Sequence, residues 1–592
     1  MILQLLKGMS GAVLRFPLTV VSLLGATVLI CYMISLHRTP SLVIQKLMFT
    51  FLVGAILGMA AQFSMERFKK LWKMRLMVYG ISILLTVGYF MILWPAPEIR
   101  AEITVRTFVA VFALICAALW VPSFKNQADF NRVALIHFKS VFTSALYSGV
   151  LSAGIAAIIA AVDILLFHVN NDAYPYMMTV VWVMFAPLYY MSLLPKFNFE
   201  DDLGLEAMNS ASNYPRFLEI LVSYIAIPLV ATYTLVLLAY FIKILVTFRW
   251  PSGQLGPMVL VYSAAGLLIF VLASLLENRF AMLYRKIFPK ALIPIVIMQM
   301  ISVAIRLRAY GVTESRYYVA LFGIFSIVIG ILLSVKPVSK NQYIALLAAG
   351  FAIFSVIPPM DAFTVSRSSQ ISRVEKILQA EGILAGGKLT PKADIQENSK
   401  VETTNILSYL ESRSSLKYIQ WLPEDFRMYR DMKAVLGFEP TYGGLNAELN
   451  SRYFSANADM KKPLIISGYD ISVQVFSNRY KNGPESTPVT FNVKGIDYIL
   501  TVNRISNEEV RISVKNSSGI ELIGTGLYDF VKGLAGSGNT PKEAMPAEKM
   551  TLDVAQNRYK LKVILQNVNM TLGTGTDTGV DYSATVLFGI PQ

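Results

Sequence analysis

From Pro17 to Pro359 the chain repeats apolar stretches of about 17 to 30 residues, separated by short polar segments. A helix needs about 20 residues to cross the hydrocarbon core of a bilayer, and lipid offers no partner to an unpaired backbone group. The pattern therefore predicts a polytopic bundle of membrane-spanning helices. We expect eleven crossings, at residues 17–36, 42–63, 74–94, 103–122, 142–167, 174–194, 217–246, 256–276, 291–307, 316–334 and 342–358.

The pattern changes after Pro359, and residues 361–592 have the alternation of a water-soluble region. Apolar residues first recur at helical spacing and then, from about residue 463, at every second position. Helices followed by strands predict a soluble α+β domain with an antiparallel sheet. We expect helices at 366–384, 399–410, 425–436 and 528–534, and strands at 465–476, 489–493, 498–502, 510–514 and 559–568.

These patterns divide the chain into three parts. Residues 1–360 form a transmembrane helical domain, 361–440 the helical start of the tail, and 441–592 a strand-rich C-terminal domain. Residues 1–14 have an amphipathic helical pattern and are expected to lie flat at the membrane interface. The first apolar stretch is too long for a signal peptide and lacks a cleavage site, so we expect a retained helix.

The formal net charge of +15 could indicate nucleic-acid binding, but its location argues against that. Up to Met360 the chain has 27 Lys and Arg against 13 Asp and Glu, whereas from Asp361 onward the counts are 26 and 25. The excess lies between predicted membrane helices, where Lys and Arg mark the cytoplasmic side. A nucleic-acid-binding protein would instead have a basic patch on a soluble face.

The same residues predict the orientation. With the N-terminus inside, the inner loops have 18 Lys and Arg and the outer loops 9. An odd number of crossings then places the C-terminal domain outside the cytoplasm, and the loss of one crossing would reverse that side. The largest inner clusters are Arg67/Lys69/Lys70/Lys73/Arg75 and Arg279/Arg285/Lys286/Lys290.

One candidate polar site is Asp163, because an ionisable group inside a membrane helix is costly and suggests function. It lies about four residues from the predicted outer end of the fifth crossing. It could accept a proton or bind a cation. It could equally cap a neighbouring helix or reach water at the headgroups.

A second candidate is a polar stripe on the long seventh crossing, where Glu219, Tyr233, Tyr240 and Lys243 share one third of the helix circumference. Pro228 lies between them and is expected to kink the helix. The stripe could line a substrate path. We favour the alternative in which Glu219 and Lys243 reach opposite interfaces and the tyrosines form hydrogen bonds within the bundle.

Other motifs do not predict a cofactor or a metal site. His37, His137 and His168 have no ligand spacing, and the acidic loop with Glu200, Asp201, Asp202 and Glu206 lacks the EF-hand pattern. The segment from Gly382 to Leu389 is similar to a phosphate-binding loop, but Leu389 occupies the position of the magnesium-binding hydroxyl. We interpret Gly386 and Gly387 as the stop of the preceding helix.

Several strings together resemble a bacterial family of multi-pass membrane proteins, domain-of-unknown-function family 4153. They are Arg15-Phe16-Pro17, His137-Phe138-Lys139-Ser140, Leu218-Glu219, Tyr224, Ile227-Pro228-Leu229, Tyr233, Tyr240, Lys243-Ile244-Leu245, Pro359, Asp361, Ser369-Gln370, Arg373 and Ile377-Leu378. The resemblance covers most of the membrane part and the first tail helix. It implies a bacterial cytoplasmic-membrane protein with an extracytoplasmic tail, and it carries no activity.

Our leading hypothesis is a non-enzymatic inner-membrane protein whose tail senses, scaffolds or binds an envelope protein partner. The bilayer itself is the other expected partner. A transporter or flippase-like protein using Asp163 and the polar stripe is the alternative, although corresponding broken helices in two halves are not evident. A membrane enzyme acting on lipid-linked substrates is a second alternative, but Glu98, Glu102 and Asp172 are scattered.

Overall fold

The computed structural model describes residues 2–126, 128–197, 202–247, 255–442, 453–460, 463–477, 488–506, 508–535, 544–571 and 579–590. The chain divides into two compact units, Met1–Arg373 and Val374–Gln592. Each unit is described by itself below.

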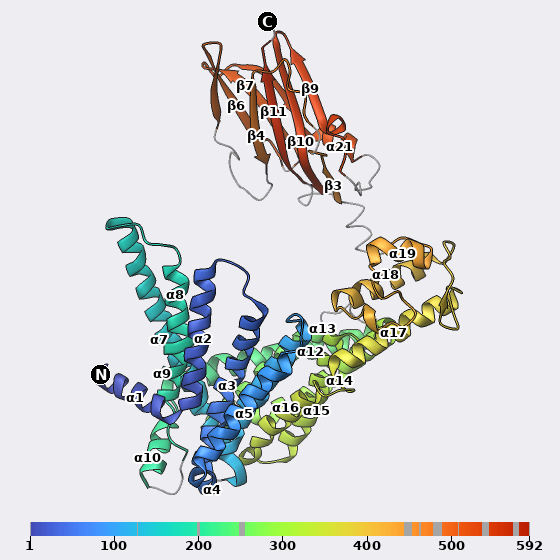
Figure 1. Ribbon diagram of the computed structural model, residues 1–592. Coiled ribbons are helices and arrows are strands. Elements are labelled where there is room, and N and C mark those ends of the chain that lie inside the picture. Colours follow the sequence, from blue (N-terminus) through green and yellow to red (C-terminus); the bar gives the residue numbers. More distant parts are fainter. Residues whose placement is uncertain are drawn as a thin grey trace. The chain divides into compact units, whose positions relative to one another are not determined.

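The described part of the first unit consists of helices (Figure 1). Up to η2 these are α1 Ile2–Arg15, α2 Pro17–Leu36, α3 Leu42–Arg67, α4 Lys69–Lys73, α5 Arg75–Leu93, α6 Ala101–Trp120, η1 Val121–Asn126, α7 Phe130–Leu165, α8 Ala173–Thr179 and η2 Val180–Phe185. The others are α9 Ala186–Ser192, α10 Asp202–Ala211, α11 Arg216–Ile220, η3 Leu221–Ala226, α12 Ile227–Thr247, α13 Leu255–Ala273, α14 Arg279–Tyr310, α15 Glu314–Val335, η4 Val338–Lys340, α16 Gln342–Phe354 and α17 Ala362–Ala380.

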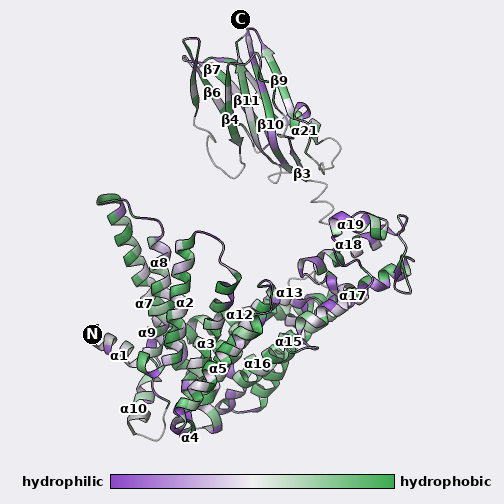
Figure 2. Cartoon of the chain, in the orientation of Figure 1, coloured by the Kyte–Doolittle hydropathy of each residue, from purple (hydrophilic) through white to green (hydrophobic). Residues whose placement is uncertain are grey.

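Within the described ranges, nine helices are long and apolar enough to cross a membrane. Their apolar residues face outward to an extent that water would not tolerate, since only 11% of the apolar window of Phe130–Leu165 is buried inside the protein. Figure 2 shows the same helices as predominantly hydrophobic along their length. The predicted membrane bundle is confirmed.

Three predicted crossings have irregular or short helices. The crossing at 174–194 is built from α8 and α9 with the π-helix η2 between them, and the crossing at 217–246 contains the π-helix η3. At 342–358 the α-helix α16 has only 13 residues, about 20 Å, which is less than the hydrocarbon thickness.

Two other predicted crossings are parts of longer helices. The fifth, predicted at 142–167, belongs to the 36-residue α7, and the ninth, predicted at 291–307, belongs to the 32-residue α14. The basic cluster from Arg279 to Lys290 therefore lies on a helix and not in a loop. Hydropathy detects only the segment suited to lipid, whereas the helix begins at its cap. The Oδ1 atom of Asn278 accepts a hydrogen bond of 3.0 Å from Ala281 N and caps α14.

The membrane unit has two main hydrophobic cores. One gathers residues of α1, α2, α3, α7 and α9, including Phe16, Phe63 and Met191. The other gathers α12 to α15, with Phe270 and Phe288 among its buried side chains. Each core lies among the helices that surround it, while the outer faces of those helices remain apolar.

Hydrogen bonds hold the N-terminal half of the first tail helix, α17, against the membrane unit. The Nε2 atom of Gln370 donates to Tyr310 O at 3.0 Å and to Val312 O at 2.9 Å, and the hydroxyl of Ser369 accepts from Val312 N at 2.9 Å. The buried Asp361 caps the same helix by accepting from Phe363 N at 3.1 Å. The Ser369-Gln370 string therefore serves to hold the connection between α14 and α15.

The second unit continues with α18 Glu397–Ser412, η5 Leu416–Tyr418 and α19 Met428–Leu436. Between α17 and α18 the strands β1 Leu384–Ala385 and β2 Lys388–Leu389 form a hairpin. Gly386 and Gly387 have φ values of +56° and +79° and make its two-residue turn. The prediction of a helix stop at these glycines was wrong, because α17 already ends at Ala380 and the pair serves the hairpin.

The strands form two antiparallel sheets, with α21 Tyr528–Leu534 and η6 Ala547–Met550 between strands (Figure 1). One sheet has the order β3-β10-β11-β4 with β9 also paired to β10, and the other has the order β5-β6-β7-β8. The strands are β3 Tyr453–Asn457, β4 Ile471–Ser477, β5 Val489–Val493, β6 Ile496–Arg504, β7 Val510–Asn516, β8 Glu521–Gly526, β9 Thr551–Gln556, β10 Tyr559–Thr571 and β11 Gly579–Gly589.

The two sheets share one core and form a β-sandwich. Phe588 of β11 lies 5.3 Å from the ring of Tyr498 on β6 and 5.7 Å from that of Phe491 on β5, measured between centroids. Val514 and Leu561, from opposite sheets, are fully buried in the same cluster. The predicted soluble domain with antiparallel sheet is confirmed.

Candidate functional site

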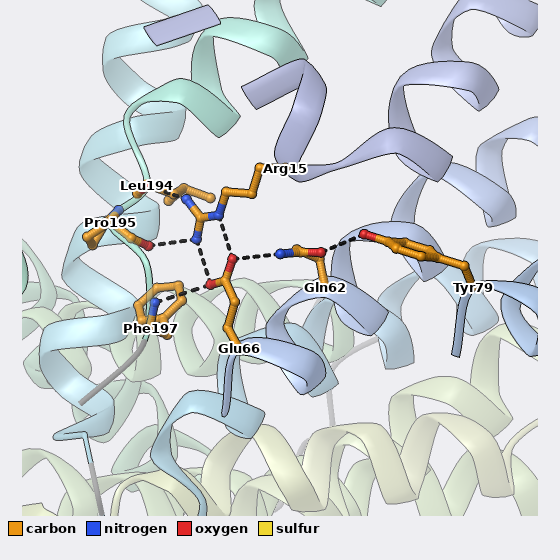
Figure 3. Close-up of polar contacts among 7 residues, drawn as sticks. All are labelled: Arg15, Gln62, Glu66, Tyr79, Leu194, Pro195 and Phe197. Carbon is orange, nitrogen blue, oxygen red and sulfur yellow. Dashed lines mark hydrogen bonds and ion pairs between the residues drawn. The ribbon is translucent and has the colours of Figure 1, made fainter. Parts of the chain in front are cut away.

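Arg15, the last residue of α1, donates four hydrogen bonds (Figure 3). Its Nε and Nη2 atoms donate to the two carboxylate oxygens of Glu66 at 2.6 and 2.7 Å. Nη1 donates to Leu194 O at 2.6 Å, and Nη2 also donates to Pro195 O at 2.8 Å. The side chains of Arg15 and Glu66 are only 11% and 5% exposed. This bidentate arrangement is stronger than an ion pair with a single hydrogen bond.

Glu66 extends the network through two further hydrogen bonds. It accepts hydrogen bonds from Gln62 Nε2 at 2.9 Å and from Phe197 N at 3.2 Å. The Oε1 atom of Gln62 in turn accepts from the hydroxyl of Tyr79 on α5 at 2.7 Å (Figure 3). One arginine thereby joins α1, α3, α5 and the segment that follows α9.

The local sequence explains how Arg15 reaches this position. Phe16 separates α1 from α2 and is 1% exposed, while Pro17 occupies the first helical position of α2. Proline is suited to that position because its missing N–H would have no helical partner. The Arg15-Phe16-Pro17 string is thus a helix junction that anchors its aromatic ring and directs the guanidinium inward.

An aromatic cluster lies beside the ion pair. Phe63 contacts Phe16, Phe197 and His137 edge-on, with centroids 5.7, 5.2 and 5.6 Å away. His137 is buried, and its Nδ1 atom lies 2.6 Å from the hydroxyl of Tyr190. The strings that begin with Arg15 and His137, 122 positions apart in the sequence, therefore meet in one core.

A cavity of about 940 Å³ opens beside this network. Gln62, Glu66 and Tyr79 line one part of it. Its lining also includes the basic residues Arg15, Lys69, Arg75 and Lys196 and the side chains of Leu14, Trp72 and Leu76. Among the described lining residues, four are basic and Glu66 is the one acidic residue. The cavity is therefore suited to a negatively charged group.

The structure places Asp163 in a local arrangement at the end of α7. Its Oδ1 atom accepts from Val169 N at 2.7 Å and lies 3.0 Å from Nδ1 of His168. The Asp163 side chain is 36% exposed. These contacts fall within the loop that follows its own helix, so the carboxylate organises that loop.

The polar stripe lies on α11 and α12. Tyr233 and Tyr240 pack on the second core, and the Tyr233 ring lies 5.9 Å from that of Tyr262. Lys243 is exposed and Glu219 is half-buried. Burial, followed by the charge of Glu219, raises the pKa of Tyr214. The structure brings the two tyrosines to one core, whereas the bonds of Asp163 remain in its own loop.

Three of the other acidic candidates lie close to a basic side chain, and two fall outside the described residues. Glu98 is paired with Arg100, Glu102 lies 2.7 Å from Arg106, and Asp172 lies 3.2 Å from His37. Glu200 and Asp201 fall outside the described ranges. Within those ranges, no group of three His, Cys, Asp or Glu side chains is placed to hold a metal ion.

The sequence analysis did not single out Glu66, Gln62 or Tyr79. A signal was present, because Glu66 is an acidic residue directly before the basic run that begins at Arg67. An acid at the end of an apolar stretch is a natural partner for an arginine at the start of another.

Comparison with known proteins supplies a family. The family model described as a domain of unknown function, DUF4153, matches residues 24–388. An uncharacterized protein of Pasteurella multocida (strain Pm70) is 25% identical over 262 residues. That match covers 43% of each chain, so this chain spans less than half the length of that relative. No solved structure matches this chain.

Proposed function

We propose that this chain, which belongs to the DUF4153 family, is a non-enzymatic inner-membrane protein. In this proposal it holds a binding domain outside the cytoplasm. In this proposal residues 1–360 anchor the protein, 361–440 connect, and 441–592 bind or scaffold an envelope partner. The observation that carries it is the β-sandwich, which has its own buried core and belongs to a compact unit separate from the nine apolar helices. A domain of this kind can present a binding surface independently of its anchor.

The side of the tail is tested by cysteine labelling. Cys31 and Cys116 are the two native cysteines, so a C31S/C116A background gives a chain without thiols. Single cysteines at the exposed positions Ser412 in the tail and Lys70 on α4 then report the two predicted sides. In spheroplasts, a membrane-impermeant maleimide should label S412C without lysis and K70C only after lysis. The same labelling behaviour at both positions would contradict the proposal.

The role of the tail is tested by truncation before Glu381. This deletion keeps α17, whose Gln370 holds the connection between α14 and α15. The truncated protein should insert into the membrane and fail to complement a gene-deletion strain. Complementation at the level of the full chain would remove the tail from the function.

A second candidate function, translocation of a lipid or solute, is favoured by the two π-helices. η2 and η3 interrupt two consecutive membrane segments, and π-helical turns are frequent at functional sites. Glu219 lies just before η3, on the same continuous helical segment as Tyr233, Tyr240 and Lys243. In this proposal these residues and Asp163 form polar sites along the path.

Translocation is tested with D163N and K243M, which remove a charge while keeping side-chain size. Flux or growth should fall in both variants if these groups serve transport. A control variant, R100Q, removes a charge from an exposed pair outside the path. Wild-type behaviour of D163N and K243M would eliminate this candidate.

A further inference from the structure

The cavity beside Arg15 has a position in the membrane that indicates its ligand. Gln62 and Glu66 lie at the end of the span Leu42–Arg67, and Tyr79 lies in the first turns of the span Arg75–Leu93. Arg15 lies two residues before the span Pro17–Leu36, with Phe16 between them. Three apolar helices therefore begin or end at this cavity. Because the ends of membrane-spanning helices lie at the level of the lipid headgroups, the cavity lies at that level as well.

The charge of the cavity is that of an anion site. Glu66 is bound on both oxygens by Arg15, so these two charges offset each other. Arg75 and Lys196 add two positive charges to the lining, which also includes Lys69. Arg75 and Lys196 are exposed, and among the described residues neither side chain has a hydrogen-bond or ion-pair partner. Two cations facing one cavity favour a phosphate group there.

The rim of the cavity is apolar. Leu14 and Leu76 are 85% and 83% exposed, and the indole of Trp72 is 50% exposed. Large apolar side chains exposed in this way are expected where acyl chains cover them, and tryptophan prefers the headgroup level. The volume of about 940 Å³ is that of a site for a small organic molecule and far exceeds a phosphate ion.

We propose that this cavity binds the headgroup of an anionic phospholipid. Arg75 and Lys196, with Lys69 nearby, contact the phosphodiester, and Leu14, Trp72 and Leu76 contact the start of the acyl chains. The Arg15–Glu66 pair, together with Gln62 and Tyr79, forms the rigid polar base of the cavity. This inference does not depend on the side of the tail or on the function of the β-sandwich.

Gly11 provides a way to place a bulky side chain in the cavity without disturbing the fold. It lines the cavity on α1, and a Cβ atom added there would meet no atom within 4 Å. Leucine at this position also favours the helix. Gly88 on α5 is a matched control, because a Cβ atom there meets equally open space and Gly88 is outside the cavity lining.

The experiment measures binding of tail-labelled phosphatidylglycerol and phosphatidylcholine to the delipidated full-length protein in detergent. Phosphatidylglycerol should bind the wild type and G88L with equal affinity. Both proteins should bind phosphatidylglycerol more tightly than phosphatidylcholine. Each cation is worth about fivefold, so R75Q/K196Q should weaken phosphatidylglycerol binding roughly thirtyfold. G11L should weaken binding of both lipids by obstructing part of the cavity, while the melting temperature is unchanged.

Each of the following outcomes would overturn the inference. Equal affinity of the wild type for the two lipids would show that charge does not select the ligand. Wild-type binding by G11L would place the lipid elsewhere. Displacement of phosphatidylglycerol by an equal concentration of inorganic phosphate would identify a soluble anion as the ligand. If G11L fails to fold, R75Q/K196Q still decides, because wild-type affinity in that variant contradicts the proposal.

Discussion

At the scale of single residues, the Arg15–Glu66 pair shows why one charged contact can organise a membrane unit. Both groups are almost completely removed from water, so each needs the other as a partner. The four donated hydrogen bonds of Arg15 reach a carboxylate and two backbone carbonyls. A lysine could not reproduce this planar arrangement of donors.

Removing either partner should therefore destabilise the protein strongly. R15Q and E66Q should each cost about 3 to 5 kcal/mol, because each leaves the opposite charge buried and unpaired. The double variant R15Q/E66Q should lose clearly less than the sum of the two. Thermal unfolding of the detergent-solubilised protein measures these changes.

A matched control is R100Q, which breaks the exposed pair with Glu98. Their side chains are 37% and 57% exposed, so the loss should stay below about 1 kcal/mol. If R15Q and R100Q gave equal losses, burial would not be the source of the stability.

Sequence reasoning identified the strings that begin with Arg15 and His137 but did not place them together. The pairing of Arg15 with Glu66 joins positions that are 51 apart, and the contact of Phe63 with His137 joins α3 to α7. Such contacts depend on which helices are neighbours, and hydropathy gives no information about that. Asp163 was found because a charge inside an apolar run is visible locally.

At the scale of elements, α13 and α14 make an unusually close contact at Gly266. A Cβ atom at this position would lie 2.3 Å from the ring of Phe288, and the hydroxyl of Tyr284 donates to Gly266 O at 2.9 Å. Phe288 cannot move easily, since its ring stacks on Tyr284 with centroids 4.9 Å apart. The small residue is what allows the two helices to approach.

Gly266→Ala should separate these helices and cost about 1 to 3 kcal/mol by overpacking. Gly88→Ala is the matched control, because its Cβ atom would meet no atom within 4 Å. The two melting temperatures should therefore diverge, with G266A below the wild type and G88A at or above it. A decrease of equal size in both variants would point to a general effect of replacing glycine in these helices.

In the β-sandwich, an ion pair between neighbouring strands gives a pH dependence. Arg511 Nη2 donates to Glu521 Oε1 at 2.6 Å, and this hydrogen bond holds the pKa of Glu521 below its ordinary value. A lowered pKa in the folded state contributes stability above the unfolded pKa of about 4.3, which is lost as pH falls through the folded value. The contribution should stay below about 1 kcal/mol, because both side chains are partly exposed.

Chemical unfolding between pH 6 and pH 3 (about the range set by these pKa values) measures this contribution as the difference between the wild type and R511Q. The wild type should lose its advantage over R511Q as the solution becomes acidic. A difference that does not change with pH would show that the pair contributes nothing through the charge of Glu521.

Element prediction succeeded where periodicity was clear and failed where burial removed it. The spacing predicted β5, β6, β7 and the short helix α21 closely. It missed β11, which lies between β10 and β4 and is buried along nearly all of its length. A strand buried on both faces has no alternation of polar and apolar residues. β3, β8 and β9 were also missed.

At the scale of the whole molecule, the chain contains one unit whose surface suits lipid and one whose surface suits water. The membrane unit places apolar side chains outward, whereas the β-sandwich gathers them into one interior cluster. Composition alone indicated this division, because the fraction of apolar residues changes near Pro359. The position of the last helices was harder to predict, since α16 is shorter than a full crossing.

Because the two units have separate cores, the protein should unfold in detergent in two transitions. Leu561 is fully buried in the β-sandwich, so L561A should cost about 2 to 5 kcal/mol and lower one transition by roughly 4 to 20 °C. G266A should lower only the other transition. Differential scanning calorimetry of the full chain measures both. If either variant shifted both transitions together, the units would unfold as one cooperative block, and the β-sandwich could not act independently of its anchor.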